Sequence, residues 1–513
     1  MSKKKKSQSP RKTLETMDFL SLVLYLLLTF TLLRALLALV RPTKPQNLPP
    51  GPTPLPIIGN LLKLGSKPHK SLAELAKTHG PIMTLKLGHI TTVVISSSTI
   101  AREVLQKQDL AFSTRSVPNS LYAYDHYQYS VVWLPISERW RSLRKVMNLN
   151  IFASNKLDIY QHLRCQKIQE LLTSVYKSGQ EGVAVDIGQA AFKTSLNLLS
   201  NTIFSMDLAD PNEDWGEEFR DLVLNIMEMI GKPNLVDYFP ELAKIDPQGI
   251  RRSMKGSFEK VLRLFGRLID ERLEKRRLGK TLGNDDLLDV LLNISEENGD
   301  EFDRTQIERL CLDLFDAGTD TTSSTVEWAM TELLCNPEVL KKAKVELENV
   351  IGKGKSIEES DVGRLPYLQA IVKETLRIHP PAPFLIPREV NTDVEVSGYK
   401  IPKGTKVLVN AWAISRDPNT WPNATSFMPE RFLDSEIDFR GRDFEFIPFG
   451  AGRRICPGLP LAIRMIPLML GSLINSFDWK LENGIAAEDL DMEDRFGITL
   501  QKDQPLRAIP IIV

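Results

Sequence analysis

A ten-residue segment near the C-terminus, Phe449–Gly458, constrains this chain more than any other feature. It reads FGAGRRICPG and places a single cysteine, Cys456, in a turn of glycines, a proline and two arginines. Glycine lets backbone N–H groups approach a sulfur atom closely, and such donors together with positive charge favour a thiolate over a thiol. Pro457 and Gly458 then precede an apolar stretch, Leu459–Leu470, that predicts the start of a helix. A cysteine held in this way suits one axial thiolate ligand on a haem iron.

The alternative is that Cys456 is a buried structural cysteine beside a glycine-rich turn. The joint spacing of the residues around it favours the haem ligand instead. The residues that carry this spacing are Phe449, Gly452, Arg454, Cys456 and Gly458. We therefore predict that Cys456 is the metal ligand and that Phe449, Gly450 and Arg454 also contribute to cofactor binding.

Charge and cysteine usage exclude several other classes of protein. The 513 residues include 65 basic and 65 acidic side chains, and this zero formal net charge argues against a nucleic-acid-binding protein. The four cysteines form no C-x-x-C pair, which argues against a disulfide scaffold or a zinc site and fits a cytosol-facing compartment. No glycine-rich dinucleotide fingerprint follows a strand-like segment, so reducing power is expected to come from another protein.

The N-terminal sequence predicts a membrane anchor followed by a stiff connection. Phe19–Val40 is apolar apart from a few hydroxyls and Arg34, and as a helix it would span about 33 Å, roughly one bilayer core. A cleaved signal peptide is disfavoured because the apolar run is long and no small-residue cleavage site follows it. We expect a basic extension at 1–16, an anchor at 17–41, a proline-rich hinge at 42–56 and one catalytic domain at 57–513.

The basic extension conflicts with the rest of this topology. Its lysines favour a cytosolic N-terminus by the positive-inside rule, and this would place the catalytic domain in the lumen. A start at Met17 instead leaves the nearest basic residues on the C-terminal side of the anchor, with the catalytic domain in the cytosol. We therefore interpret residues 1–16 as an upstream extension or an artefact of the gene model.

The remainder is predicted to be mainly α-helical with a minor β portion. Two β-like runs, Ile82–Leu87 and Thr91–Ser96, flank a turn and predict a hairpin. Strand-like segments return in 385–410. The clearest helical patterns are Ser257–Arg277, Arg304–Cys335 and Pro337–Val350.

A polar interruption, Ala317–Thr322, lies in the middle of the helical run 304–335. Its hydroxyls can bond to carbonyls four residues earlier and open the helix locally, which would make a groove for dioxygen and a water beside the iron. Asp320 and Thr321 are then predicted to be catalytic, by relaying protons during oxygen activation. A solvated polar helix face is the alternative, and the apolar residues on both sides of the interruption disfavour it.

Two further pairs of residues support the cysteine motif. Glu374 and Arg377 share one helix face and, with Arg431, are predicted to form a network that locks the loop carrying Cys456, although an ordinary surface ion pair would have the same spacing. Trp140 and Arg144 lie one helical turn apart and can hold a carboxylate such as a haem propionate. Arg388 and Arg454 are further propionate candidates. The basic residues near Trp140 are either solvated or a landing patch for an acidic redox partner.

In this order, these motifs resemble those of plant microsomal cytochromes P450 over nearly the whole chain. The resemblance implies the P450 fold, haem b, an endoplasmic-reticulum anchor and NADPH–cytochrome P450 reductase as the electron donor. Further stretches are similar to the geraniol 8-hydroxylase group of this family. They are Ser200–Ser205, Gly231–Asp237, Asp246–Arg252 and Phe496–Lys502.

The activity implied by the resemblance is monooxygenation, in which one oxygen atom of O2 enters an unactivated C–H bond of a small apolar substrate. A monoterpenoid alcohol, geraniol or nerol, is the expected substrate. The tyrosine-rich loop 122–129 departs from the expected pattern, so another terpenoid or specialised metabolite remains an alternative, as does a non-oxygenase haem-thiolate isomerase. The expected pocket walls are Tyr122, His126, Phe315, Ala317, Phe384, Leu385 and Ile498.

Overall fold

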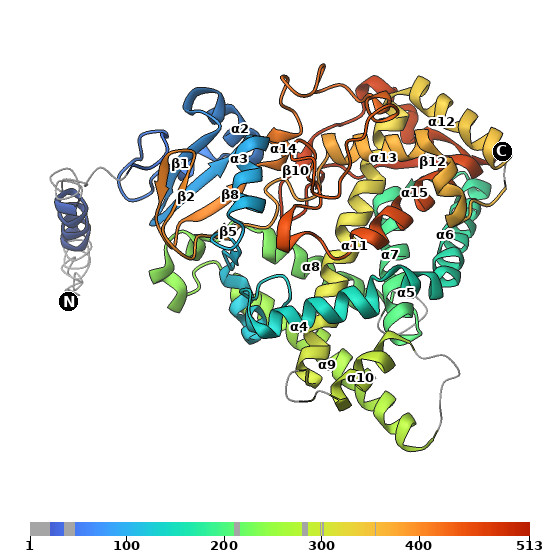
Figure 1. The fold of residues 1–513 in the computed structure, drawn as a ribbon, viewed down its shortest axis with the longest axis horizontal. Helices are drawn as coiled ribbons and strands as arrows, with labels where there is room; N and C mark the ends of the chain where they lie inside the picture. Colours follow the sequence, from blue (N-terminus) through green and yellow to red (C-terminus); the bar gives the residue numbers. More distant parts are fainter. Residues whose placement is uncertain are drawn as a thin grey trace, which may run out of the picture.

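A long central helix, α11 (Arg304–Cys335), organises the computed structural model, and the larger sheet lies at one end of the molecule (Figure 1). The structure describes residues 21–34, 47–209, 216–279, 286–297, 299, 302–353 and 355–512. Asp303 caps α11, because its side chain accepts a hydrogen bond of 2.8 Å from the backbone N–H of Gln306. Helix α7 (Ile187–Phe204) packs closely along α11, where a Cβ atom at Gly318 would come within 2.9 Å of Leu199.

The larger sheet has five strands in the order β1-β2-β8-β5-β3. β1 (Ile82–Leu87) and β2 (Ile90–Ile95) form the predicted antiparallel hairpin, and β8 (Lys406–Val409) runs parallel to β2. β5 (Arg388–Glu389) joins β8 to β3 (Thr114–Arg115). This pairing brings segments that are distant in sequence into register at the edge of the sheet.

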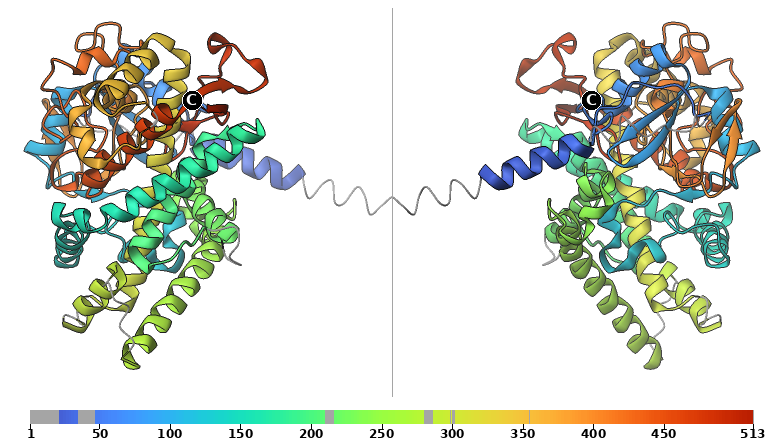
Figure 2. Two further views of the ribbon diagram at one scale, coloured as in Figure 1. Left: turned by 90° about the vertical axis from the view of Figure 1, so that its right-hand side faces the viewer. Right: turned by 90° about the vertical axis from the view of Figure 1, so that its left-hand side faces the viewer.

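The remaining helices surround α11, and both views of Figure 2 show α9 projecting from the lower side of the molecule. The α-helices not yet described are α2 (Pro68–His79), α3 (Ser98–Arg102), α4 (Glu138–Val146), α5 (Ser154–Ile159), α6 (Gln161–Glu181), α8 (Gly216–Gly231), α9 (Ile250–Arg277), α10 (Leu287–Glu297), α12 (Pro337–Val350), α13 (Pro366–Ile378), α14 (Ala411–Ile414) and α15 (Leu459–Ser476). A run of 3-10 turns, η3 (Asn119–Gln128), packs against α9.

The shorter strands form a three-stranded sheet and two hairpins. The sheet has the order β4-β12-β9, and the hairpins are β6-β7 and β10-β11. These strands are β4 (Val185–Asp186), β6 (Val394–Val396), β7 (Tyr399–Ile401), β9 (Phe477–Leu481), β10 (Asp494–Arg495), β11 (Gln501–Lys502) and β12 (Arg507–Ile512).

The predicted helices and strands are present, and some of them begin or end at different residues from those predicted. α11 and α12 have the predicted bounds, whereas α9 begins at Ile250, earlier than the expected Ser257. α15 continues past Leu470 to Ser476, and within it Gly471 packs so closely on α13 that a Cβ atom there would lie 2.9 Å from Leu368. The observed architecture is mainly α-helical with a minor β portion, as predicted.

The predicted hinge is partly integrated into the fold. The carbonyl of Pro50 accepts a hydrogen bond of 2.8 Å from Thr84 in β1, and the carbonyl of Asn47 accepts one of 2.8 Å from Lys400 in β7. Gly51 is so close to β1 that a Cβ atom would lie 1.9 Å from the Thr84 oxygen. The folded domain therefore begins before the predicted boundary at residue 57, because these carbonyls pair with strands.

The predicted anchor is only partly visible. Within the described residues, Ser21–Arg34 forms a short apolar helix, while residues 1–20 and 35–46 lie outside them. α15 is the one described helix whose length and hydropathy would allow it to cross a membrane. Because 61% of it is buried inside the folded domain, α15 is a core helix.

Candidate active site

The Cys456 loop is a tight turn that leads directly into α15. The backbone N–H of Cys456 donates to the carbonyl of Phe449 at 3.0 Å. Gly452 adopts a left-handed conformation with φ of +69°, and a Cβ atom there would lie 2.0 Å from the Leu105 oxygen, so only glycine fits. Gly450 also has a positive φ, of +72°. Close packing at Gly452 thus fixes the backbone of the loop before the sulfur.

Burial opposes the electrostatic effects that are expected from the sequence to favour a thiolate at Cys456. Burial raises the pKa of the thiol, and this effect outweighs the hydrogen bonds from the N–H groups of Gly458 and Leu459 and the positive charge of Arg144. The sequence reveals the groups that can donate hydrogen bonds to the sulfur, but it does not reveal how far the thiol is removed from water. The positive charge of a bound metal ion would stabilise a thiolate at this position.

Four guanidinium groups gather near the Cys456 loop. They belong to Arg115, Arg144, Arg388 and Arg454. The sheet register places Arg115 directly opposite Arg388. Three of the four donate to main-chain oxygens, with distances of 2.8 Å from Arg115 to Ile386, 3.1 Å from Arg388 to Phe112 and 3.1 Å from Arg454 to Ser113. No carboxylate in the described part of the chain forms an ion pair with any of them.

This cluster of like charges needs an anion. Burial, followed by the charges of the other three arginines, holds the pKa of Arg115 well below its usual range. Burial also lowers the pKa of Arg388 to about 10 and, with neighbouring positive charge, that of Arg454 to about 9. Buried charges without a partner cost several kcal/mol, so a ligand that brings two carboxylates would be stabilised here. The two propionates of a haem supply that pattern of charge.

Trp140 contributes through its ring and not through its N–H group. The indole Nε1 donates to the carbonyl of Val131 at 3.1 Å, so it is not free to bind a carboxylate as predicted. Instead the ring supports two members of the cluster, with the guanidinium of Arg454 at 4.7 Å and that of Arg144 at 5.7 Å from its centre. Trp140 is therefore a positioning residue for the arginines.

Arg115 is a candidate cofactor-binding residue that the sequence interpretation missed. It lies far from Cys456 in the sequence and belongs to no recognisable motif. Only the pairing of β3 with β5 brings it beside Arg388. A two-residue strand gives too weak a signal to predict that pairing from the sequence.

One face of α11 is open in the middle of an otherwise buried helix. From Arg309 to Leu334, every side chain is buried except Ala317, Gly318 and Thr321, which lie at i, i+1 and i+4 on one face. Leu461, in the first turn of α15, packs against both apolar clusters to which α11 contributes. Helix α15 therefore packs along α11.

The hydroxyl groups of this segment back-bond as predicted, but the helix does not open. Thr321 donates to the carbonyl of Ala317 at 2.9 Å, and Thr322 donates to that of Gly318 at 3.0 Å. α11 nevertheless remains a continuous α-helix from Arg304 to Cys335. Space beside the helix therefore comes from the small residues on its face and not from a local break.

Asp320 and Thr321 are adjacent in sequence but meet different surroundings. Thr321 lies on the open face, whereas Asp320 is 3% exposed and its carboxylate accepts a hydrogen bond from Gln501 in β11. Burial raises the pKa of Asp320, and hydrogen bonds from Thr499 and Gln501 offset this only in part. Arg495 donates to the Gln501 side-chain oxygen at 2.6 Å, so a polar chain links Asp320 to the exposed hairpin.

The predicted network of Glu374, Arg377 and Arg431 is present. The carboxylate of Glu374 and the guanidinium of Arg377 are completely buried and form two hydrogen bonds of 2.7 Å. Arg431 donates to the same carboxylate at 3.2 Å, as does the backbone N–H of Met428 at 2.8 Å. Arg377 also donates to the carbonyl of Ser415 at 2.8 Å. The pair is therefore a structural network and not a surface ion pair.

A chain of aromatic rings connects this network to the Cys456 loop. Phe432 follows Arg431 and packs on Phe446 with ring centres 5.2 Å apart. Phe446 contacts Phe439, which in turn packs edge-on against Phe449 at 5.8 Å. Phe449 accepts the hydrogen bond from Cys456, so the network and the loop are held in one packed unit.

Comparison with known proteins agrees with this geometry. The sequence pattern of the family described as Cytochrome P450 matches residues 49–506. The chain belongs to the cytochrome P450 family. It is 66% identical over 494 residues to geraniol 8-hydroxylase from Catharanthus roseus and 63% identical over 492 residues to geraniol 8-hydroxylase from Swertia mussotii, in each case covering 96% of this chain and 99% of the relative. It is also 57% identical over 495 residues to 7-ethoxycoumarin O-deethylase from Helianthus tuberosus, with the same coverage.

Membership of the family accounts for the features near Cys456. Cytochromes P450 of this kind are monooxygenases that use haem, O2 and electrons from a reductase. The partly buried cysteine, the arginine cluster without a counter-ion and the open face of α11 all fit a haem. The fold is the cytochrome P450 fold, mainly α-helical with a minor β portion, as the sequence predicts.

The structure places the predicted pocket walls of this P450 in several different surroundings. Phe384 packs against Phe496 at 5.8 Å, and Leu385 lies next to Gly450 of the cysteine loop. Ile498 lies in the turn between β10 and β11, where Gly231 at the end of α8 packs so closely that a Cβ atom would be 2.3 Å from the Ile498 nitrogen. Two of the segments similar to the geraniol 8-hydroxylase group therefore meet at this hairpin.

The other predicted pocket walls lie along α11 and η3. Tyr122 is 45% exposed and packs on Tyr127, while His126 is buried with its Nε2 atom 3.2 Å from the carboxylate of Asp313. Ala317 lies on the open face, as predicted. Phe315 does not, because its side chain is completely buried among the aromatic rings of α7, α8 and α9. Its role is therefore core packing.

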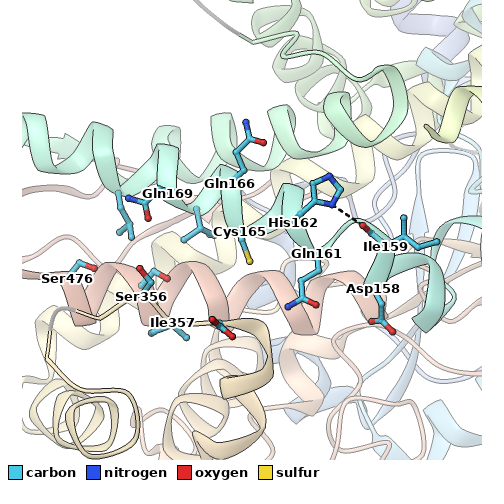
Figure 3. Close-up of a pocket in the computed structure, with 14 residues that line it drawn as sticks. Asp158, Ile159, Gln161, His162, Cys165, Gln166, Gln169, Ser356, Ile357 and Ser476 are labelled. Carbon is cyan, nitrogen blue, oxygen red and sulfur yellow. Dashed lines mark hydrogen bonds between the residues drawn. The ribbon is translucent and has the colours of Figure 1, made fainter. Parts of the chain in front are cut away.

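A separate cavity of about 750 Å³ lies between α6 and α15 (Figure 3). Gln161, His162 and Cys165 of α6 line it from one side, and Ser472 and Ser476 of α15 line it from the other. No residue of α11 takes part. This cavity is therefore distinct from the space at Ala317 and Thr321.

Proposed function

We propose that this cytochrome P450 hydroxylates a monoterpenoid alcohol of the geraniol type. The observation that carries the proposal is the 66% identity to a geraniol 8-hydroxylase over almost the whole of both chains. The apolar walls provided by Phe384, Leu385 and Ile498 suit the hydrocarbon part of such a substrate.

The cofactor in this proposal is haem b, with Cys456 as its axial ligand. Arg115, Arg144, Arg388 and Arg454 would hold the propionates, and Trp140 would keep two of these arginines in place. The haem, when bound, supplies the activation of dioxygen and the transfer of one oxygen atom to a substrate C–H bond. Electrons would come from NADPH through NADPH–cytochrome P450 reductase.

Asp320 and Thr321 would deliver protons to the open face of α11. Thr321 lies on that face, and because its hydroxyl donates to the carbonyl of Ala317, its oxygen would accept a hydrogen bond from a water bound there. Asp320 has a raised pKa, so it keeps a proton to higher pH than an ordinary aspartic acid does. Gln501 donates a hydrogen bond to this carboxyl and Arg495 donates to Gln501, so the two side chains orient the acid without carrying a proton themselves. An acid and a hydroxyl placed for proton delivery favour an oxygenase over an isomerase.

The proposed location is the endoplasmic-reticulum membrane, with the catalytic domain in the cytosol. The apolar helix Ser21–Arg34 is part of the expected anchor at 17–41, and Tyr25 and its neighbours are exposed. A start at Met17 would give this orientation, with residues 1–16 as an extension.

The substrate class is tested by turnover with the full-length holoenzyme and reductase in membranes. We expect NADPH-dependent formation of one hydroxylated product from geraniol and from nerol, because the terpenoid chain fits the apolar walls. Product analysis by mass spectrometry identifies the carbon that is oxidised. Products from larger terpenoids with none from geraniol or nerol would favour the second candidate, a P450 for another terpenoid, which the tyrosine-rich loop also supports.

Proton delivery is tested by Thr321→Ala. We expect NADPH consumption to continue while product formation falls by about a hundredfold, because a water bound at the open face loses the hydroxyl oxygen that would hold it for proton delivery. The measurement is the ratio of product formed to NADPH consumed. Thr319→Ala is the matched control, since Thr319 makes the same kind of back-bond, of 2.8 Å to Phe315, but is buried away from the open face. An unchanged ratio in Thr321→Ala would contradict the role.

A further inference from the structure

Asp316 is a buried acid without a partner, directly beside the open face of α11. It precedes Ala317, which is exposed, and its own side chain is only 8% exposed. Its Oδ1 atom is buried and has no hydrogen-bond partner among the described residues. No described lysine, arginine or histidine forms an ion pair with it. Such an atom destabilises the folded protein unless a ligand supplies the missing hydrogen bond.

The surroundings of Asp316 favour the neutral form of its carboxyl group. Burial raises its pKa well above the usual value, and the nearby carboxylates of Asp313 and Asp320 raise it further. A neutral carboxyl has one O–H donor and one carbonyl acceptor. It can therefore bind a hydroxyl or carbonyl oxygen, and it has no charge with which to attract an amine.

Asp313, on the same helix, is a carboxylate with a structural role and serves as a comparison. It lies one turn earlier and accepts hydrogen bonds of 2.7 Å from Ser130 and 2.8 Å from the backbone of Val131. These bonds tie α11 to the segment that follows η3. Asp316 makes no such contact, so it holds no element of the fold in place.

Other buried polar atoms in this part of the protein also lack partners. They include Nδ1 of His126, whose other ring nitrogen faces Asp313, and Nε of Arg309, which lies two turns before Asp316 on the same side of α11. The region between α11 and η3 is therefore more polar than a hydrocarbon alone would require. A ligand with one polar end fits this arrangement.

We propose that Asp316 binds the hydroxyl group of the substrate and so determines which end of the molecule is oxidised. This inference rests on the proposed function and adds to it the residue that binds the polar end of the substrate. Asp316 and Thr321 are five residues apart, which is about 7.5 Å along the helix axis and about 140° around it, and Ala317 lies between them. A substrate held by its hydroxyl at Asp316 therefore presents a carbon remote from that hydroxyl to the open face near Thr321.

The test compares Asp316→Leu with Asp316→Asn by optical titration of the haem-loaded enzyme. The ligands are geraniol and the hydrocarbon in which its hydroxyl is replaced by hydrogen. We expect the wild type to bind the alcohol about tenfold more tightly than the hydrocarbon, because only the alcohol satisfies the buried acid. Asp316→Leu should lose this preference, and Asp316→Asn should keep most of it, since an amide still binds a hydroxyl.

Two further measurements separate substrate binding from a structural role. The melting temperature of Asp316→Leu should equal or exceed that of the wild type, whereas Asp313→Leu should melt lower because it breaks the bonds to Ser130 and Val131. In turnover, Asp316→Leu should spread hydroxylation over several carbons. The proposal would be overturned if Asp316→Leu had a lower melting temperature and lost equal affinity for the alcohol and the hydrocarbon. It would also be overturned if geranylamine bound more tightly to the wild type than to Asp316→Asn.

The same titration distinguishes this proposal from the proposed function. If geraniol is not a substrate, pairs of larger terpenoid alcohols and their hydrocarbons are titrated in the same way. A preference for the alcohol that disappears in Asp316→Leu supports the role of Asp316 even though the substrate assignment fails. Absence of any preference for alcohols in the wild type refutes the role of Asp316, even if geraniol is hydroxylated.

Discussion

Cys456→Ser is expected to abolish hydroxylation and the thiolate signature of the carbon-monoxide complex of the reduced haem. Serine provides no thiolate, and thiolate ligation is what favours O–O cleavage on the iron. The fold should survive, because the introduced hydroxyl oxygen can accept the same N–H groups of Gly458 and Leu459. The measurements are the carbon-monoxide difference spectrum and product formation with reductase.

Cys165→Ser is the matched control for this substitution. Cys165 is also partly buried but lies on α6, where it lines the cavity of Figure 3 and contacts none of the arginine cluster. This variant should keep the spectrum and the rate of the wild type. A thiolate spectrum that persists in Cys456→Ser would refute the assignment of the axial ligand.

Arg377→Met is expected to lower the free energy of unfolding by about 3–5 kcal/mol. The substitution leaves the Glu374 carboxylate completely buried without its main partner, and breaking a buried pair in this way is strongly destabilising. The carbonyls of Ser415 and Ala424 also lose their donor. Denaturant unfolding of the haem-loaded protein measures the change, and haem content should fall because the aromatic chain to Phe449 loosens.

An exposed pair provides the control. Lys342 is 57% exposed and contacts Glu430 at 2.7 Å, so Lys342→Met should change the free energy of unfolding by no more than about 1 kcal/mol. The double variant Glu374→Leu with Arg377→Met should recover part of the lost stability, because no charge is left unpaired. Equal decreases in the free energy of unfolding in Arg377→Met and Lys342→Met would contradict the proposal that burial makes the Glu374–Arg377 pair important for stability.

The features predictable from the sequence are those carried by short local patterns. The Cys456 turn depends on glycines and a proline within ten residues, and α11 depends on a long apolar period. The Glu374–Arg377 pair depends on helical spacing alone. Each of these features is recognisable because the residues that define it are neighbours along the chain.

The missed features depend on contacts between distant segments or on the direction of a side chain. Arg115 reaches the arginine cluster only through strand pairing, and Gln501 reaches Asp320 only because the hairpin folds over α11. Phe315 is two residues from Ala317, but two residues turn a helix by about 200°, so its side chain enters the opposite core. The N–H group of Trp140 binds the carbonyl of Val131, a contact that no local pattern predicts.

The hairpin of β10 and β11 has a consequence for the redesign of this enzyme. Its turn carries Ile498 among the expected pocket walls, while Gln501 in β11 holds Asp320, the acid proposed to supply protons. The same hairpin therefore affects both the choice of substrate and the fraction of consumed NADPH that leads to product. A residue change at the turn that admits a bulkier molecule would also displace the amide of Gln501, and reducing equivalents would then be wasted as reduced oxygen species instead of forming product.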